Sequence, residues 1–156
     1  MSKTHTGATP CEHAVQSARR AVSGGIDRAA LKTACLVLLE EVALPHPAGH
    51  GKNFARYILR TQEDERVELM FEKGEKGLAH LWLNMIHADE LLKSTLDCRN
   101  YPASAVYDAD STVKKPNHGR HASLKSMREL ANADLVRFTL TSSTQMRMIL
   151  DHLATK

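Results

Sequence analysis

The spacing of apolar positions predicts two helices at the start of the chain. Residues 12–22 place alanines and valines at helical intervals, and residues 23–25, Ser-Gly-Gly, should end that helix because glycine tolerates a left-handed stop. A stronger helical pattern covers residues 27–43 and gives way to a proline- and glycine-rich break over residues 44–51. The face that this second helix should bury consists of Leu31, Ala34, Cys35, Leu38, Leu39 and Val42.

Strand patterns follow in the middle of the chain. Residues 56–61 form a possible strand, and residues 67–71 and 78–83 flank a charged loop with two glycines, as the arms of a β-hairpin do. The first arm has the alternation of a half-buried strand, in which Val67, Leu69 and Phe71 alternate with Glu68 and Met70. Residues 84–96 then have a helical pattern, and residues 104–108 are a short strand candidate.

The clearest unit is a strand followed by a helix at the C-terminal end. Residues 134–140 alternate, so that Val136, Phe138 and Leu140 share one face. Residues 142–145, Ser-Ser-Thr-Gln, match a capping box, in which a serine oxygen and a glutamine side chain satisfy backbone donors at a helix start. The helix that begins there should bury Met146, Ile149, Leu150 and Leu153.

This order of elements predicts an α+β fold. We expect a small, mostly antiparallel sheet covered by helices, with an N-terminal helical pair and a C-terminal strand–helix unit. The 156 residues fit one domain, with residues 1–10 as a flexible tail and residues 11–156 as a single α+β domain. Apolar residues make up 42% of the chain, yet no apolar run is long enough to span a membrane. We therefore expect no membrane partner.

The cysteines and the N-terminus indicate a cytoplasmic protein. Cys11, Cys35 and Cys98 are odd in number, widely spaced and without a CxxC pair, which favours a reducing compartment. The polar start of the chain lacks the apolar core of a secretion signal. Secretion by a standard signal is therefore not expected.

Charge is distributed unevenly along the chain. The formal net charge is only +3, but residues 57–110 carry six basic and eleven acidic side chains, whereas residues 111–156 carry eight and three. These two segments therefore have net charges of −5 and +5. Segments of opposite charge can face each other within one chain or across a dimer.

The basic residues are most concentrated over residues 111–128, which contain no carboxylate. Gly119 would let the backbone approach a phosphate closely, and a short helix predicted within residues 123–130 would add donors at its N-terminus. We therefore expect an intracellular nucleic-acid-binding module, with DNA or RNA as partner, that uses this basic loop for phosphate contacts. The candidate binding residues are Lys114, Lys115, Asn117, His118, Arg120, His121, Lys125 and Arg128.

Two other functions remain open. One is a protein–protein interaction or self-associating module with complementary charged faces, which the −5 and +5 segments would supply. A homodimer is one form of that hypothesis. The other is a metal-dependent hydrolase or nuclease, with ligands from the acidic hairpin or from the histidine pairs His46 and His50, and His118 and His121.

The sequence carries no recognised catalytic motif. Pro47 and Gly49 exclude a helical frame for the first histidine pair. A nuclease acid-x-lysine motif has one residue between acid and lysine, whereas Glu72-Lys73 and Glu75-Lys76 have none. No H-E-x-x-H, C-x-x-C, G-x-S-x-G or glycine-rich phosphate loop occurs. We therefore expect neither a metal site nor a cofactor, and the sequence does not support catalysis.

Overall fold

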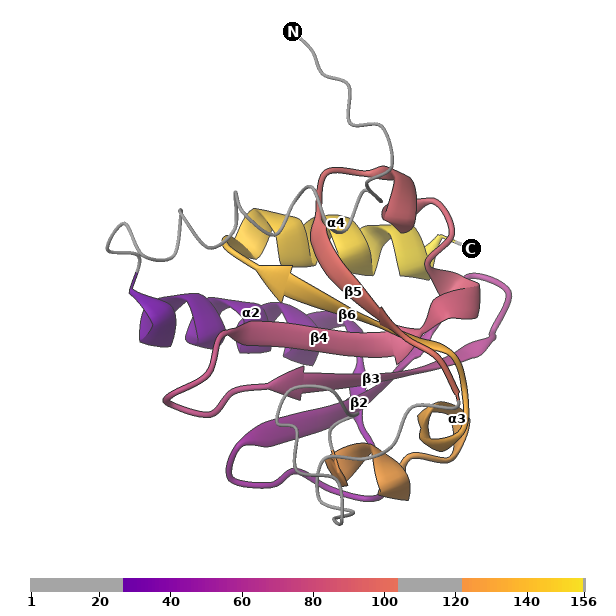
Figure 1. The fold of residues 1–156 in the computed structure, drawn as a ribbon, viewed down its shortest axis with the longest axis horizontal. Coiled ribbons are helices and arrows are strands. Elements are labelled where there is room, and N and C mark those ends of the chain that lie inside the picture. Colours follow the sequence, from indigo (N-terminus) through magenta and orange to yellow (C-terminus); the bar gives the residue numbers. More distant parts are fainter. Residues whose placement is uncertain (1–26, 104–121, 156) are drawn as a thin grey trace, which may run out of the picture.

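The computed structural model of this chain describes residues 27–103 and 122–155. They form a six-stranded antiparallel sheet in the order β1-β2-β3-β4-β6-β5, which confirms the predicted α+β class (Figure 1). The strands are β1 (Leu44–Pro45), β2 (Phe54–Arg60), β3 (Arg66–Glu72), β4 (Ala79–Asn84), β5 (Asp97–Tyr101) and β6 (Leu135–Leu140). The helices are α2 (Arg28–Val42), α3 (Arg128–Ala131), α4 (Ser143–Ala154) and the 3₁₀ helices η1 (Met85–His87), η2 (Leu91–Lys93) and η3 (Ala122–Ser126).

Several predicted elements lie outside the described residues. They are the tail over residues 1–10, the helix over residues 12–22 with its stop at 23–25, and the strand over residues 104–108. Within the described ranges, no helix combines the length and the apolar character that crossing a bilayer requires.

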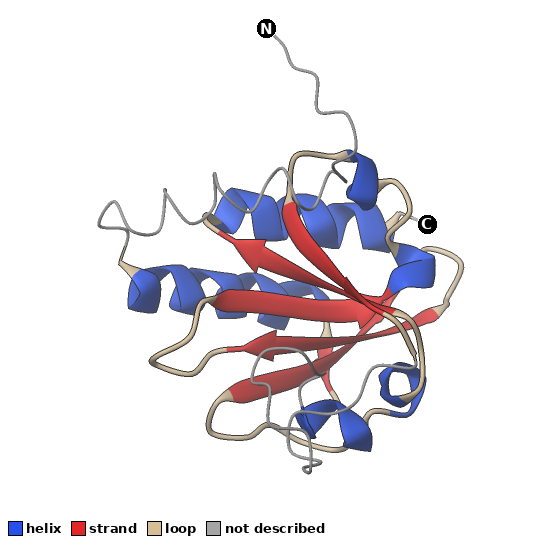
Figure 2. Ribbon diagram, viewed as in Figure 1, coloured by secondary structure: helices blue, strands red, loops and turns tan. Residues whose placement is uncertain are grey.

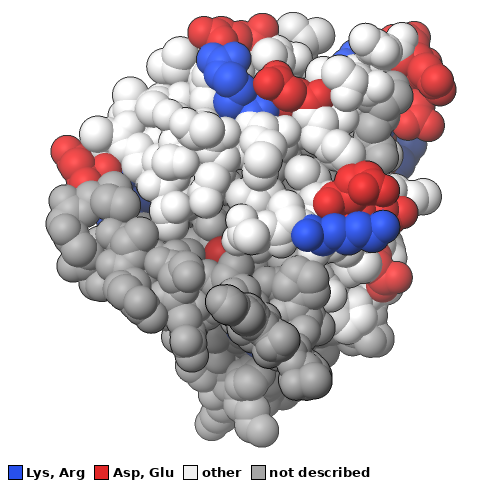
Figure 3. Space-filling view, turned by 90° about the horizontal axis from the view of Figure 1, so that it is seen from above, with Lys and Arg blue, Asp and Glu red and all other residues white. Residues whose placement is uncertain are grey.

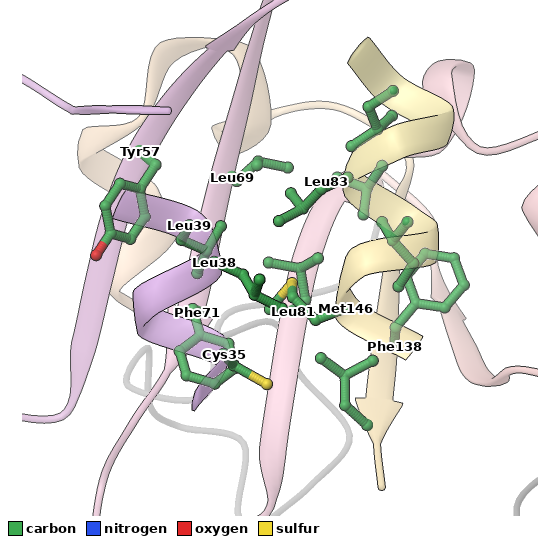
Figure 4. Close-up of a cluster of buried hydrophobic side chains, with 14 of the residues drawn as sticks. Cys35, Leu38, Leu39, Tyr57, Leu69, Phe71, Leu81, Leu83, Phe138 and Met146 are labelled. Atoms are coloured by element: carbon green, nitrogen blue, oxygen red, sulfur yellow. The ribbon is translucent and has the colours of Figure 1, made fainter. Parts of the chain in front are cut away.

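Helices α2 and α4 pack side by side on one face of the sheet (Figures 1 and 2). Because side chains alternate along a strand, every second residue of the central strands points to these helices. Figure 4 shows Phe71 and Leu81 of the sheet against Cys35 and Leu39 of α2 and Met146 of α4. All five side chains are fully buried, so this helix-covered face holds the main core.

The opposite face of the sheet, called the second face below, carries a smaller apolar cluster. It consists of Met70, Trp82, Tyr101 and Leu135 from the strands and Leu124, Met127 and Leu130 from η3 and α3. With this cover, β3 is buried on both sides. Glu68 and Met70 are only 1% and 0% exposed, so the prediction that β3 is a half-buried strand is wrong.

The helix starts follow the predicted chemistry. Asp27 Oδ1 accepts hydrogen bonds from the backbone N–H groups of Ala29 and Ala30 at the start of α2. At α4, Ser142 Oγ accepts from the backbone N–H of Gln145 at 3.3 Å, and Gln145 Oε1 accepts from that of Thr141 at 2.7 Å. The four apolar positions predicted for this last helix are all buried. The helix over residues 27–43 and the C-terminal unit are thus confirmed, but Val42, predicted to be buried, is 43% exposed.

The chain departs from the predictions between the hairpin and β6. Residues 84–96 do not form one helix; η1 and η2 follow the end of β4, and the Asn84 side chain caps η1 by accepting from the Ile86 N–H. Strand β5 was not predicted, and the expected break over residues 44–51 includes β1, which pairs with β2. The short helix expected within residues 123–130 is divided into η3 and α3.

The two cysteines of the described ranges differ. Cys35 is a free thiol, and burial raises its pKa to about 11, as expected for an unreactive core residue. Cys98 on β5 is disulfide-bonded. A disulfide is more common in oxidising compartments, so this bond departs from the reducing environment that the cysteine spacing favours.

Replacing Ser142 with alanine should lower the free energy of unfolding by about 1 kcal/mol, because a backbone donor at the start of α4 loses its acceptor. Urea unfolding followed by circular dichroism measures the change. Ser143→Ala is the matched control, since Ser143 follows the cap, and it should change stability by less than about 0.5 kcal/mol. Equal losses in both variants would contradict the capping role.

Candidate nucleic-acid interface

The second face of the sheet carries a row of basic and large apolar side chains. In the register of the sheet, Arg56 lies opposite Met70, Met70 opposite Trp82, Trp82 opposite Arg137, and Arg137 opposite Arg99. The row therefore crosses β2, β3, β4, β6 and β5. Residues directly opposite each other in antiparallel strands point to the same face, so three arginines share this surface.

Arg99 and Arg137 lie near the aromatic rings of the second-face cluster. The guanidinium carbon of Arg137 is 5.4 Å from the ring centroid of Tyr101 and 5.8 Å from that of Trp82. The guanidinium carbon of Arg99 is 5.2 Å from the Tyr101 centroid. These distances are within the range of cation–π attraction. Arg99 is exposed and Arg137 is half-buried, and in the described part of the chain neither forms an ion pair with a carboxylate.

The third arginine of the row has a structural role. Arg56 is 8% exposed and donates hydrogen bonds to the backbone oxygens of Gly49, at 2.8 Å, and Ala48. Its guanidinium carbon also lies 4.4 Å from the Phe54 ring centroid. Burial lowers the pKa of Arg56. Arg56 therefore holds the loop after β1 against the sheet.

The end of the basic segment is anchored on the same face. Leu124 and Met127 are fully buried in the cluster that contains Trp82 and Tyr101. Lys125, which follows Leu124, and Arg128, which follows Met127, are both exposed. The apolar anchors of η3 and α3 therefore hold two of the predicted binding residues on the second face.

Six of the eight predicted binding residues lie outside the described residues. They are Lys114, Lys115, Asn117, His118, Arg120 and His121. Their contact with a phosphate backbone stays a prediction. Tyr101 and Leu124, which are described and lie before and after these residues in the sequence, belong to one apolar cluster.

A buried carboxylate lies beside α3. The Glu68 side chain is 0% exposed, and its Oε2 is 2.6 Å from His46 Nε2 and 3.3 Å from an Arg66 guanidinium nitrogen. Its Oε1 accepts a hydrogen bond from the backbone N–H of Glu129 at 2.9 Å. Arg66 also forms an ion pair with the Glu129 carboxylate at 2.9 Å. Glu68 is therefore buried and bound by internal donors, although it belongs to the acidic hairpin.

The first histidine pair is occupied by structural hydrogen bonds. His46 Nδ1 accepts from the Ala48 backbone N–H at 2.9 Å, so His46 Nε2 carries the hydrogen that it donates to Glu68. His50 Nδ1 accepts from the Arg56 backbone N–H at 3.0 Å. In residues 27–103 and 122–155, no three His, Cys, Asp or Glu side chains form a group able to hold a metal ion. The metal hypothesis draws no support from His46 and His50.

Glu68 and the residues that bind it lie at a surface groove of about 610 Å³. The groove is lined by His46, Pro47, Ala48, Arg66, Glu68, Ser126, Arg128 and Glu129. Within the groove, Arg66 forms ion pairs with the carboxylates of both Glu68 and Glu129. Arg128 lies at this groove as well as in the basic segment, so the groove connects with the basic surface of α3.

The acidic loop of the hairpin is likewise tied into the fold. Lys32 of α2 is buried and donates to the backbone oxygens of Gly74 and Gly77, and its burial lowers its pKa. Glu72 accepts a hydrogen bond from Trp82 Nε1, and His80 Nδ1 is 3.5 Å from the other Glu72 oxygen. These contacts join α2 to the hairpin loop and β3 to β4.

Elsewhere on the surface of the described residues, basic side chains lie close to acidic ones. In Figure 3 the described lysine and arginine side chains lie beside acidic ones, around a broad uncharged area. On the helix-covered face, Arg147 of α4 lies 3.9 Å from Glu41 of α2. Arg147 thus has a carboxylate nearby, whereas in the described part of the chain Arg99 and Arg137 lie near aromatic rings and form no ion pair.

No protein-family model, no curated protein and no solved structure matches this chain. The sequence predicted Lys125 and Arg128 as binding residues and gave no reason to consider Arg99 and Arg137. Arg99 and Arg137 are 38 positions apart in the sequence, and the pairing of β5 with β6 places them opposite each other. That pairing is not visible in the sequence, because β5 lacks a regular apolar alternation.

Changing Glu68 to glutamine should lower the free energy of unfolding by about 3 kcal/mol, since the amide group would direct a donor at one of the donors that Glu68 now binds. Chemical denaturation at neutral pH measures the loss. Glu63→Gln is the matched control at an exposed glutamate of the neighbouring turn, with an expected change below about 0.5 kcal/mol. A Glu68→Gln protein as stable as the native one would refute the structural role.

The pH dependence of stability should reveal the ionisation of Glu129. Burial and the nearby Glu68 raise the pKa of Glu129, despite its contact with Arg66. A raised carboxyl pKa means that the folded state binds the proton more tightly, so this contribution to stability is present at low pH and is lost as the pH rises through the folded-state pKa, above 4.5.

Glu129→Gln should therefore gain stability relative to the native protein between about pH 4 and about pH 7. Urea unfolding of both proteins at several pH values gives this difference directly, and Glu63→Gln again serves as control. A difference that is constant or that falls with pH would contradict the raised pKa.

Proposed function

We propose that this protein is a nucleic-acid-binding module that contacts phosphates through its basic segment, residues 111–128. The observation that supports the proposal is the common location of two sets of cations. Lys125 and Arg128 are held on the second face by the apolar cluster that also contains the rings beneath Arg99 and Arg137. One extended polyanion could therefore contact both sets.

The proposal assigns different roles to the residues of the segment. Lys114, Lys115 and Arg120 contact phosphates, Lys125 and Arg128 extend the basic surface, and Asn117, His118 and His121 supply hydrogen bonds. Trp82 and Tyr101 are 1% and 3% exposed, so they support the arginines rather than stack on bases. Binding through phosphates alone carries little sequence preference, and we expect weak discrimination among sequences.

A second candidate function is protein–protein interaction or self-association. Exposed apolar side chains near α2 and α4 favour it, namely Val37, Val42, Leu44 and Met148. Sedimentation at low and high salt separates the two functions. A dimer that forms without retention on DNA or RNA would favour self-association, and its dissociation by salt would indicate complementary charged faces rather than apolar contact.

The proposal also places the protein in the cytoplasm, where nucleic acid is available and where the disulfide at Cys98 would be reduced. Alkylation of protein denatured directly from cells tests this location. Labelling of Cys98 would agree with a reducing compartment, whereas protection of Cys98 until reductant is added would contradict it.

Replacing Lys114, Lys115 and Arg120 together with glutamine should weaken binding to a labelled oligonucleotide and make it less sensitive to salt. The slope of log K against log salt should shrink by about three, one for each phosphate contact removed. Fluorescence anisotropy over a salt series measures the slope. The control carries Arg28→Gln, Lys93→Gln and Arg147→Gln, which remove three exposed cations elsewhere. Unchanged binding by the first variant would rule out the assignment.

A further inference from the structure

Arg99 and Arg137 are directly opposed like charges that, unlike the opposed pair Arg60 and Arg66, form no ion pair with a described carboxylate. They are direct cross-strand partners on β5 and β6, and both side chains lie on the second face. Like charges directly opposite each other on antiparallel strands destabilise a sheet. The pair therefore opposes folding unless a negative group joins it.

The described residues do not supply that group. In residues 27–103 and 122–155, neither guanidinium has an ion-pair partner, and Arg137 Nε is buried without a hydrogen-bond acceptor. A buried N–H group that lacks an acceptor forfeits the hydrogen bond that it would form with water. An anion bound between the two arginines would supply the missing negative charge and accept hydrogen bonds from their exposed N–H groups.

The aromatic rings beneath the arginines restrict the conformations of the two guanidinium groups before a ligand binds. The Trp82 and Tyr101 rings have centroids 4.8 Å apart, and Arg137 lies near both. A guanidinium that packs against a ring keeps its N–H donors in its own plane, where they can reach a ligand. Both rings are buried, so they limit the side-chain freedom that binding would otherwise remove.

We propose that Arg99 and Arg137 together bind one phosphate group. Two guanidinium groups offer more N–H donors than the two oxygens of a carboxylate can accept, whereas a phosphate offers several oxygens in different directions. Adjacent strands bring both arginines to the same ligand. The site lies outside residues 111–128, and it deepens the proposed function by adding a phosphate contact on the sheet.

The source of the phosphate rests on the proposed function: a nucleic-acid backbone supplies it if that function is correct, and a free phosphate or a small phosphorylated molecule supplies it otherwise. The site itself depends only on the geometry of β5 and β6. Two measurements on the full chain separate these possibilities.

The first measurement is thermal unfolding in inorganic phosphate against chloride at equal ionic strength. At a phosphate concentration about ten times the dissociation constant, the native protein should gain about 3 °C. Arg99→Gln and Arg137→Gln should lose this gain. Arg147→Gln, an exposed arginine on the helix-covered side, is the matched control and should keep it. Because Arg99 is exposed, its variant tests the site even if Arg137→Gln folds poorly.

The second measurement is the affinity for a labelled single-stranded oligonucleotide. Arg99→Gln should bind about tenfold more weakly than the native protein, since a charge-assisted hydrogen bond is lost. The double variant should lose less than the product of the two single losses, because both arginines hold one phosphate. Arg147→Gln should bind as the native protein does.

The outcomes distinguish the site from the function. A phosphate gain that needs both arginines, without oligonucleotide binding, supports the site and contradicts the proposed function. Oligonucleotide binding weakened only in the Arg99 and Arg137 variants supports the site with nucleic acid as the source, whether or not free phosphate binds. Variants that equal Arg147→Gln in both measurements overturn the site, and the proposed function then stands or fails by its own test.

Discussion

A buried carboxylate determines how the second face of the sheet is arranged. The Glu68 carboxyl group can be buried only where hydrogen-bond donors surround it, because an unsatisfied polar or charged group is strongly unfavourable away from water. Those donors come from the loop after β1, through His46, from the start of β3, through Arg66, and from the backbone of α3, at Glu129. The loop and α3 must therefore occupy the positions that satisfy this carboxylate, and the end of the basic segment is positioned with them.

The two faces of the sheet are stabilised by different means. The helix-covered face relies on apolar burial between α2, α4 and the strands. On the second face, polar side chains are buried together with a smaller apolar cluster, and most have an internal role. Arg56 donates to the loop after β1, and Trp82 donates to Glu72. Arg99 and Arg137 differ from these residues, because they lie near aromatic rings but form no ion pair within residues 27–103 and 122–155.

The sequence predicts the elements that have a regular apolar spacing or a capping residue of their own. The helix at 27–43, the hairpin and the C-terminal strand–helix unit follow from local periodicity and capping residues. Glu68 could not be predicted as buried, because alternation shows only that it faces away from the main core, and its cover comes from α3, about sixty positions later. Strand β5 was missed for a related reason. Its second-face residues include Asp97 and Arg99, so it lacks the apolar alternation that identifies a strand.

The strongest argument that the second face binds an anion is that two independent observations agree. The carboxylate-free segment is a property of the sequence alone, whereas the opposition of Arg99 and Arg137 is a property of strand pairing. Taken alone, a carboxylate-free segment or an opposed arginine pair can be an ordinary feature of a protein surface. However, α3 and η3 pack on the apolar cluster that contains the rings beneath these arginines, so the described end of the basic segment and the arginine pair share one face of the sheet. In the described part of the chain, Arg99 and Arg137 lie opposite each other without a carboxylate partner, which lowers the stability of the sheet. Such a cost is usually retained where a ligand removes it.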